Sequence, residues 1–242
     1  MTSRTSEASL VVVIPTFNEA DNIESLVNEL LQLECQPRVL IVDDNSPDGT
    51  GKIADRLAAG QPDRVFVKHR LKKQGLGRAY VDGLTTALAM GTTHIAQMDA
   101  DHSHRPIDLQ TMMEAAVSTN ADLVLGSRYI DGGSTVGWPR HRQWISRFGS
   151  WYSGKVLGVH IRDLTGGFKI WKRELLSQID LPSISSDGYS FQIETTWRAT
   201  RNNAEIEQVP IVFHDRIAGA SKLSRAVVFE AGLVVWKLRF NR

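Results

Sequence analysis

The stretch Ile95–His104, with the sequence IAQMDADHSH, runs from an apolar segment directly into two carboxylates, Asp99 and Asp101. Side chains two positions apart on a strand point to the same face, so an extended chain that reaches Asp101 would present both carboxylates on one side. Paired oxygen ligands suit Mg²⁺ or Mn²⁺, which take one or two carboxylates from a protein and complete their shell with substrate phosphates. The alternative is a solvated turn after a strand, because Asp is common in loops.

The chain before this stretch alternates between strand and helix patterns. Its short apolar runs are rich in Val and Ile without polar alternation, as in strands buried on both faces of a parallel sheet. The expected strands cover Leu10–Ile14, Val39–Val42, Val65–Val67 and Ile95–Met98. Helical spacing of apolar residues lies between them, at Ile23–Leu33, through Ile53, Ala54 and Leu57, and from Arg78 to Met90. This order predicts an α/β fold with one open, mostly parallel sheet.

Polar clusters follow three of these strands, at Pro15–Glu19, Asp43–Asp48 and Asp99–Asp101. Pro15 is expected to end the first strand, and Asn18 or Asp21 to cap the next helix. Ligands of parallel sheets bind beyond the carboxyl ends of the strands, where all three clusters would lie. The chain has neither a GxGxxG motif after its first strand nor a GxxxxGK[ST] motif. A phosphate-bearing ligand would therefore need a metal and basic side chains, which suits a nucleotide diphosphate-sugar.

Composition narrows the class of protein. The 242 residues suffice for one large domain, and a net charge of +1 argues against a general nucleic-acid binder. The single cysteine, Cys35, excludes an internal disulfide and a multi-cysteine zinc site, and is interpreted as a packing residue. Residues 1–9 are polar and are expected to form a disordered tail rather than a signal peptide. No apolar run approaches the roughly 20 residues that span a bilayer, which predicts a soluble or peripheral protein.

Basic residues are prominent in the second half of the chain. A helix is expected at Pro106–Ser118 and a strand at Asp122–Leu125, so that Arg128 follows a strand at the same sheet edge as the carboxylates. In WPRHRQWISR, Arg142 and Ser146 are four residues apart and therefore neighbours on one helix face. A guanidinium and a hydroxyl in that arrangement can hold a phosphate. The alternative is a solvated basic helix end.

Two loops complete this half. The turn Asp163–Phe168 contains paired glycines, which permit close backbone approach or positive φ. Strands are expected at Phe168–Trp171 and Ile206–Phe213, with a helix opening near Gly188 in which Glu194 is a buried functional or structural acid. The loop of small residues from Ala218 to Leu223 has a cation at each end, Arg216 and Lys222, an arrangement expected of a lid over phosphates.

The last segment, residues 224–242, is expected to be an amphipathic helix. Its basic residues Arg225, Lys237, Arg239 and Arg242 outnumber Glu230 among several apolar side chains. Two interpretations stay open, because apolar helical spacing serves both. The helix either lies in a membrane interface or packs on the sheet.

Seven motifs resemble those of the polyprenyl-phosphate mannose synthases, a group of family 2 glycosyltransferases whose nearest members are the dolichyl-phosphate mannose synthases. They are VVVIPTFNE, IVDDNSPDGT, MDADHSH, LVLGSRY, DLTGGFK, GYSFQIE and VPIVFHDRIAGASKL, and they follow the family's order from about Leu10 to Leu223. The resemblance implies a single Rossmann-like domain of GT-A type over residues 10–223. Its nucleotide-sugar half would cover residues 10–125 and its acceptor half residues 126–223.

The resemblance also implies a role for each matching residue. The nucleotide would contact Pro15, Phe17, Glu19, Val42, Asp44, Asp99 and Ala100. Asp99 and Asp101 would hold Mg²⁺ or Mn²⁺, and Ser103 is the next metal-proximal position. The acceptor phosphate would be gripped by Arg128, Arg142 and Ser146, and the donor diphosphate approached by Arg216 and Lys222.

The implied reaction is transfer of mannose from GDP-mannose to polyprenyl phosphate, with inversion at the anomeric carbon. The enzyme would be peripheral on the cytoplasmic face of a membrane, with a possible integral-membrane partner protein and no nucleic-acid partner. Three alternatives remain: transfer of glucose or another sugar to the same lipid, a sugar-phosphate nucleotidyltransferase, and a non-catalytic nucleotide-sugar-binding subunit of a membrane complex.

Overall fold

The computed structural model describes residues 8–215 and 225–240. Its strands are β1 (Leu10–Thr16), β2 (Arg38–Asp43), β3 (Val65–His69), β4 (His94–Gln97), β5 (Leu123–Ser127), β6 (Ser134–Val136), β7 (Lys169–Lys172), β8 (Ile206–Pro210) and β9 (Val212–His214). Its α-helices are α1 (Ile23–Leu31), α2 (Thr50–Gly60), α3 (Leu76–Ala89), α4 (Pro106–Thr119), α5 (Arg140–Leu157), α6 (Arg173–Gln178), α7 (Gly188–Arg201) and α8 (Arg225–Phe240).

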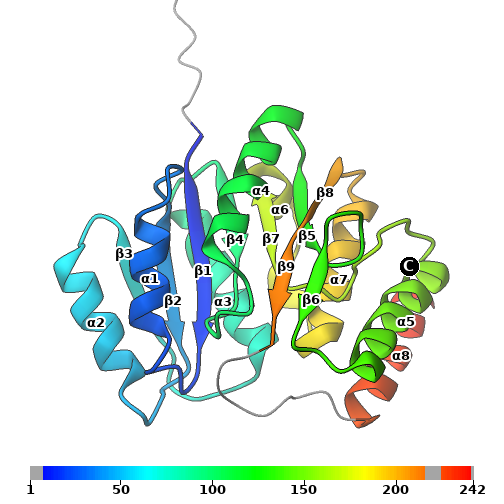
Figure 1. The fold of residues 1–242 in the computed structure, drawn as a ribbon, viewed down its shortest axis with the longest axis horizontal. Coiled ribbons are helices and arrows are strands. Elements are labelled where there is room, and N and C mark those ends of the chain that lie inside the picture. Colours follow the sequence, from blue (N-terminus) through cyan, green and yellow to red (C-terminus); the bar gives the residue numbers. More distant parts are fainter. Residues whose placement is uncertain (1–7, 216–224, 241–242) are drawn as a thin grey trace, which may run out of the picture.

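One sheet of seven strands, in the order β3-β2-β1-β4-β7-β5-β8, forms the centre of the molecule (Figure 1). All neighbouring strands are parallel except at β7, which runs antiparallel to both β4 and β5. The predicted open, mostly parallel sheet is therefore confirmed. β7 turns the segment that precedes it, residues 163–168, toward the edge at which the parallel strands end.

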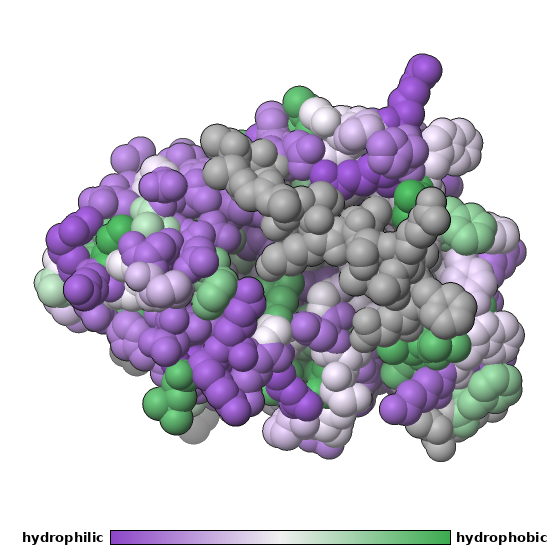
Figure 2. Space-filling model, turned by 90° about the horizontal axis from the view of Figure 1, so that it is seen from below, coloured by the Kyte–Doolittle hydropathy of each residue, from purple (hydrophilic) through white to green (hydrophobic). Residues whose placement is uncertain are grey.

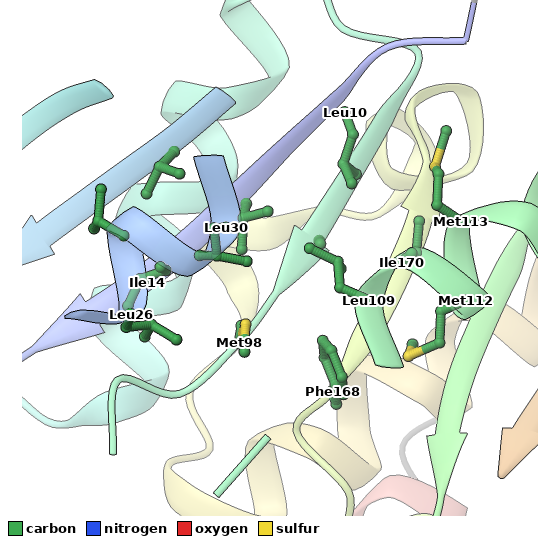
Figure 3. Packing of buried hydrophobic residues seen from close by; sticks show 14 of the residues in the cluster. Leu10, Ile14, Leu26, Leu30, Met98, Leu109, Met112, Met113, Phe168 and Ile170 are labelled. Atoms are coloured by element: carbon green, nitrogen blue, oxygen red, sulfur yellow. The ribbon is translucent and has the colours of Figure 1, made fainter. Parts of the chain in front are cut away.

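Helices cover both faces of the sheet. Alternate residues of β1 pack on opposite sides: Leu10, Val12 and Ile14 join the layer of α1 and α4, whereas Val11 and Val13 join the layer of α3 and α6. Figure 3 shows the first layer, in which apolar side chains of β1, α1 and α4 meet. Burial on both faces is the reason that the strand sequence shows no polar alternation.

The close approach of α3 to the sheet depends on a glycine. A Cβ atom on Gly83 would lie 2.4 Å from Val13 Cγ1 and 2.9 Å from Val42 Cγ2. Any larger residue would push α3 away from β1 and β2. Both strands lead into the polar clusters described above.

Several expected boundaries are wrong in detail. β1 continues through Pro15, which pairs with Val42, because the fixed φ of proline is compatible with extended backbone. Neither Asn18 nor Asp21 caps α1: the amides of Asn22 and Ile23 both donate to the Glu19 carbonyl, so a turn precedes the helix.

The strand expected at Ile206–Phe213 is two strands. β8 ends at Pro210, which has no amide hydrogen to extend the ladder with β5, and β9 pairs with β6 in a separate two-stranded sheet. The strand β6 and the helix α6 were not expected from the sequence.

The expected C-terminal helix is present as α8, and it contacts α5 and α7 rather than the sheet. Val235 is fully buried among Leu157, Leu164 and Ile193, and the Trp236 indole donates a hydrogen bond of 2.7 Å to the Tyr152 hydroxyl. Of the two alternatives left open for this helix, packing on the sheet is therefore not the one observed, and a place in a membrane interface stays a prediction. Across residues 8–215 and 225–240, no helix combines the length and apolar character needed to span a bilayer.

Lys169, the first residue of β7, is a buried lysine with no carboxylate partner at hydrogen-bond distance among residues 8–215 and 225–240. Its ammonium donates to the Gln192 carbonyl at 2.8 Å and to the Thr195 hydroxyl at 2.9 Å. Burial lowers the pKa of Lys169 well below its ordinary value of 10.5, and the charge of Asp163 opposes the shift without cancelling it. The lysine is thus a site at which folding favours loss of a proton.

We expect Lys169→Met to remove a pH dependence of stability. Between the lowered pKa of Lys169 and 10.5, the unfolded chain holds a proton that the folded chain does not, so the free energy of unfolding rises with pH. The contribution is at most about 1.4 kcal/mol per pH unit. Denaturant unfolding of both proteins between about pH 6 and 9 measures it. Parallel pH profiles for the two proteins would contradict a lowered pKa.

Candidate active site

A cavity lies beyond the carboxyl ends of β1, β2 and β4, and all three predicted polar clusters contribute to it. We call it the carboxylate cavity. Its lining includes Pro15, Thr16, Phe17, Glu19, Asp44, Asp99, Ala100 and Asp101, together with Lys73, Gly75, Leu76 and Ala79 from the start of α3 and the loop before it. Val42 is fully buried behind the cavity and does not line it. Most of the residues predicted to contact a nucleotide therefore line one cavity at the predicted edge of the sheet.

Asp99 is held by contacts from two other parts of the chain. The Tyr80 hydroxyl, on α3, donates to Asp99 Oδ1 at 2.8 Å. Burial, together with the charge of Asp99, raises the pKa of Tyr80 well above its usual value, so the phenol keeps its proton and remains a donor. A Cβ atom on Gly167 would lie 3.2 Å from Gln192 Nε2 and in ordinary van der Waals contact, 3.8 Å, with Asp99 Oδ2, so the segment before β7 lies beside Asp99; Gly167 does not have a positive φ.

The two carboxylates are presented by a turn and not by an extended strand. β4 ends at Gln97, and His102 has a left-handed φ of 57°. Asp101 Oδ1 accepts a hydrogen bond of 3.1 Å from the Ser103 amide, which closes the turn. The chain is therefore not extended as far as Asp101, the condition under which both carboxylates would share one face of a strand, yet both line the same cavity.

These residues fit a hard divalent cation by the chemistry of their donors. Two carboxylates are what Mg²⁺ and Mn²⁺ commonly take from a protein when phosphates supply the remaining oxygens. Ser103 lies outside the cavity lining, and its buried hydroxyl has no hydrogen-bond partner in the part of the chain that the structure describes. Within those same ranges, no group of three or more His, Cys, Asp or Glu side chains is arranged to hold a metal ion.

Two cations without a role assigned from the sequence lie at or next to this cavity: Lys73 lines it, and Arg70 contacts its residue Asp44. Arg70 pairs with Asp44 and donates to Asp82 at 2.7 Å, which fixes the Asp44 carboxylate. Burial raises the pKa of Asp44, and Arg70 opposes that shift. Lys73 places its ammonium 3.7 Å from the centre of the Phe17 ring, at the cavity wall.

The loop that carries Lys73 is anchored by a distant carboxylate. Asp187, directly before α7, accepts a hydrogen bond of 2.5 Å from the Gly77 amide at the start of α3. Gly75 has φ of 99°, and a Cβ there would overlap Asp187. The loop thus depends on a contact that spans more than a hundred residues, for which the local sequence gives no signal.

Arg128 lies in a buried ion pair. Its Nε and one terminal nitrogen each donate to Asp163 at 2.7 Å, and that terminal nitrogen also donates to the Thr165 hydroxyl at 2.9 Å. Burial alone would lower the pKa of Arg128, but Asp163 outweighs it and the net shift is upward; the pKa of Asp163 is lowered in turn, against its own burial, by Arg128. The guanidinium stays charged in a site of 3% exposure.

Arg142 and Ser146 share one helix, α5, as predicted, and lie beside this ion pair. Ser146 Oγ is 3.4 Å from the Thr165 hydroxyl. The Arg142 guanidinium lies 4.0 Å from the centre of the Trp138 ring and donates to Asp215 at 2.7 Å. Its Nε is buried and unpartnered among the described residues. We call Arg128, Arg142, Ser146 and Thr165 the phosphate cluster.

Packed aromatic rings connect the phosphate cluster with the turn that carries Asp99 and Asp101. The His104 ring accepts from the Asp99 amide at 3.3 Å and lies 4.6 Å from Phe168 and 5.2 Å from Phe213. Phe213 lies 5.3 Å from Trp138. Burial lowers the pKa of His104, which keeps the ring neutral and able to accept this hydrogen bond.

The remaining residues singled out from the sequence are Glu194, Arg216 and Lys222. Glu194 is a buried structural acid, paired with Arg198 at 2.6 Å and bonded to the Ser186 hydroxyl. Arg216 and Lys222 lie outside the described residues. Sequence reasoning named the motif that contains Asp163 and Thr165 but assigned neither residue a contact, and it missed Tyr80 altogether.

Two relatives are similar over nearly the whole chain. Polyprenol monophosphomannose synthase of Mycolicibacterium smegmatis is 44% identical over 231 residues, which cover 95% of this chain and 87% of that protein. Undecaprenyl-phosphate mannosyltransferase of Micrococcus luteus is 42% identical over 222 residues, which cover 92% of this chain and 90% of that protein.

Solved structures share the fold at lower identity. Glucosyl-3-phosphoglycerate synthase from Mycobacterium tuberculosis, in complex with Mn²⁺, UDP and phosphoglyceric acid, superposes with a TM-score of 0.71 at 17% identity, covering 96% of this chain and 79% of that chain. Mannosyltransferase PcManGT from Pyrobaculum calidifontis, in complex with GDP-Man and Mn²⁺, gives 0.59 at 20% identity, covering 90% and 59%.

The family model described as Glycosyl transferase family 2 matches residues 11–180, from β1 to the end of α6. This range contains the whole carboxylate cavity and the phosphate cluster. Because the model covers most of the chain and both relatives align over nearly all of it, the chain belongs to glycosyl transferase family 2.

Proposed function

We propose that this protein transfers mannose from GDP-mannose to a polyprenyl phosphate, with inversion at the anomeric carbon, to give polyprenyl phosphomannose and GDP. The observation that carries the proposal is that one sheet edge holds both the carboxylate cavity and, next to it, the phosphate cluster. The names of the two relatives at 44% and 42% identity support the sugar and the class of lipid.

The donor would bind in the carboxylate cavity, contacted by Pro15, Phe17, Glu19, Asp44 and Ala100, with Val42 supporting it from behind. Asp99 and Asp101 would hold Mg²⁺ or Mn²⁺, which neutralises a diphosphate and makes it a better leaving group. Solved relatives of this fold contain either metal. Arg216 and Lys222 stay predicted contacts of the diphosphate, and Ser103 stays the predicted metal-proximal position, with its amide donating to Asp101.

The acceptor needs positioning rather than activation. A phosphate monoester has a second pKa of about 6, so it is already a nucleophilic dianion near neutral pH and requires no general base. Arg142 offers a planar fork to its oxygens, and Ser146 a hydroxyl. Arg128, already paired with Asp163, would contribute fixed positive charge beside the phosphate. Catalysis then rests on orientation and charge stabilisation by the protein.

A lipid acceptor places the reaction at a membrane. We propose that the protein is peripheral on the cytoplasmic face, with residues 10–125 forming the donor half, residues 126–223 the acceptor half, and residues 224–242 a helix at the membrane side. An integral-membrane partner protein is compatible with this arrangement.

The experiment that tests the proposal is transfer of labelled sugar to a short polyprenyl phosphate in the presence of Mn²⁺ or Mg²⁺, with GDP-mannose, GDP-glucose and UDP-glucose as separate donors. We expect labelled lipid from GDP-mannose alone. Product from UDP-glucose would replace the proposal with a glucosyltransferase. Binding of GDP-mannose without any product would indicate a non-catalytic subunit or another acceptor.

Asp101→Asn should abolish metal-supported transfer while preserving the turn, because Asn can still accept the hydrogen bond from the Ser103 amide. We expect kcat to fall on the order of 100-fold or more, with Mn²⁺-dependent binding of GDP-mannose lost in calorimetry. Asp131→Asn, a matched substitution on an exposed turn, should behave as the parent. Full binding and turnover by the Asp101 variant would exclude Asp101 as a metal ligand.

Arg142→Lys should harm the acceptor side although the charge is kept, because the planar fork is lost. We expect kcat/KM for polyprenyl phosphate to fall about 10- to 100-fold, with the KM for GDP-mannose unchanged. Arg140→Lys, at the exposed start of the same helix, is the control. Equal kinetics for the two variants would remove Arg142 from phosphate binding.

A further inference from the structure

A second cavity, of about 560 Å³, lies between α5 and the segment 158–162 that follows it. It is separate from the carboxylate cavity, and their linings share no residue. Its lining includes Tyr129, Arg147, Trp151, Lys155, His160 and Arg162. We propose that this cavity binds the headgroup of an anionic phospholipid, at a site distinct from that of the acceptor lipid.

The charges in this lining have one sign. Arg147, Lys155 and Arg162 are cations, and no carboxylate lines the cavity. None of these three side chains makes an ion pair within the described ranges, in contrast to Arg128 and Arg142. A concave site with several unneutralised cations attracts a phosphate-bearing ligand.

The rest of the lining is apolar. The Trp151 ring, half-exposed at 58%, and the side chains of Val159 and Ile161 contribute carbon surface. A free phosphate would leave this surface in contact with water, whereas a phospholipid would cover it with glycerol and the first acyl carbons. The combination of cations and apolar surface therefore favours a lipid over an inorganic anion.

The surroundings of the cavity point to the same ligand. Trp144, Phe148 and Trp151 on α5 are 73%, 59% and 58% exposed, and Trp236 and Phe240 on α8 are 45% and 74% exposed. Apart from Trp144, these rings form a connected set: Phe148 contacts Trp151 and Tyr152 at 5.7 and 6.1 Å, the Tyr152 hydroxyl accepts a hydrogen bond from Trp236, and Trp236 stacks on Phe240 at 5.6 Å.

We call this set of rings the aromatic patch. In Figure 2, which views the molecule from the carboxyl edge of the sheet, hydrophobic residues gather at the end where Figure 1 places α5 and α8. Large exposed apolar patches mark interaction sites, and amphipathic aromatic rings favour the membrane interface. Cations beside such a patch complement the negative surface potential of a membrane with anionic lipids.

The phospholipid site would hold the enzyme at the membrane with the phosphate cluster facing the lipid pool. Ser150 lines the second cavity and also lies 3.3 Å from the Thr165 hydroxyl of the phosphate cluster. The two sites are thus adjacent, with Ser150 between them. The biological reason for such a site rests on the proposed function. The test is independent of that function, because the vesicles contain no polyprenyl phosphate and no sugar donor.

The test is co-sedimentation of the full chain with vesicles of phosphatidylcholine alone and of an equimolar mixture with phosphatidylglycerol. We expect binding to the mixture and little to phosphatidylcholine. Arg147→Gln/Lys155→Gln should weaken binding on the order of tenfold or more, since each surface cation contributes about 1 kcal/mol to attraction by an anionic membrane. Lys52→Gln/Arg173→Gln removes the same charge from exposed positions elsewhere and should weaken it much less.

A second variant distinguishes binding inside the cavity from attraction to a basic surface. Val159→Phe fills the cavity without changing charge, and it should lower the affinity for monomeric dihexanoyl phosphatidylglycerol in calorimetry, with thermal unfolding as the check on folding. Glycerol 3-phosphate should bind more weakly than the short lipid. Equal losses for the two charge variants, unchanged binding by Val159→Phe, or displacement of the short lipid by a stoichiometric polyprenyl phosphate would each overturn the proposal.

Discussion

The antiparallel insertion of β7 between β4 and β5 is the constraint on which the site depends. Because β7 runs against its neighbours, its first residue, Lys169, lies beside Gln97 at the end of β4 and Leu125 near the end of β5. The preceding turn is therefore delivered to the edge at which the parallel strands end. It brings Gly167 to Asp99 and Thr165 to Arg128.

This turn makes the donor and acceptor sides parts of one structure. Gly167 lies close to Asp99, while Asp163 pairs with Arg128 in a buried site. A buried guanidinium is costly unless it is paired, so Asp163 fixes both the charge and the position of Arg128. The rings of His104, Phe213 and Trp138 then pack between the turn that carries Asp99 and Asp101 and the phosphate cluster. Preorganisation of this kind suits a reaction whose nucleophile already carries its charge.

Local sequence patterns were sufficient to predict where the functional edge of the sheet lies, but not the side-chain contacts made there between distant segments. The Val-rich runs and the acids after them predicted β1, β2 and β4 and the cavity beyond them, because burial on both faces and polar strand ends are properties of a few adjacent residues. The hydrogen bond from Tyr80 to Asp99 and that from Gly77 to Asp187 join segments far apart in sequence, and neither partner carries a local signal. The ion pair of Arg128 was missed for the same reason: an arginine after a strand looks like an available cation until its carboxylate is located. The strand expected at Ile206–Phe213 did not take Pro210 into account, although proline has no amide hydrogen and β8 ends at this residue.

We propose that Asp99 and Asp101 bind the metal together with the donor diphosphate in the carboxylate cavity. Diffraction from crystals grown with GDP-mannose and Mn²⁺, recorded at the manganese absorption edge, tests this arrangement. We expect one anomalous peak within coordination distance of both carboxylates and of the diphosphate oxygens. A peak elsewhere, or a donor bound outside the cavity lined by Asp44 and Asp99, would contradict it.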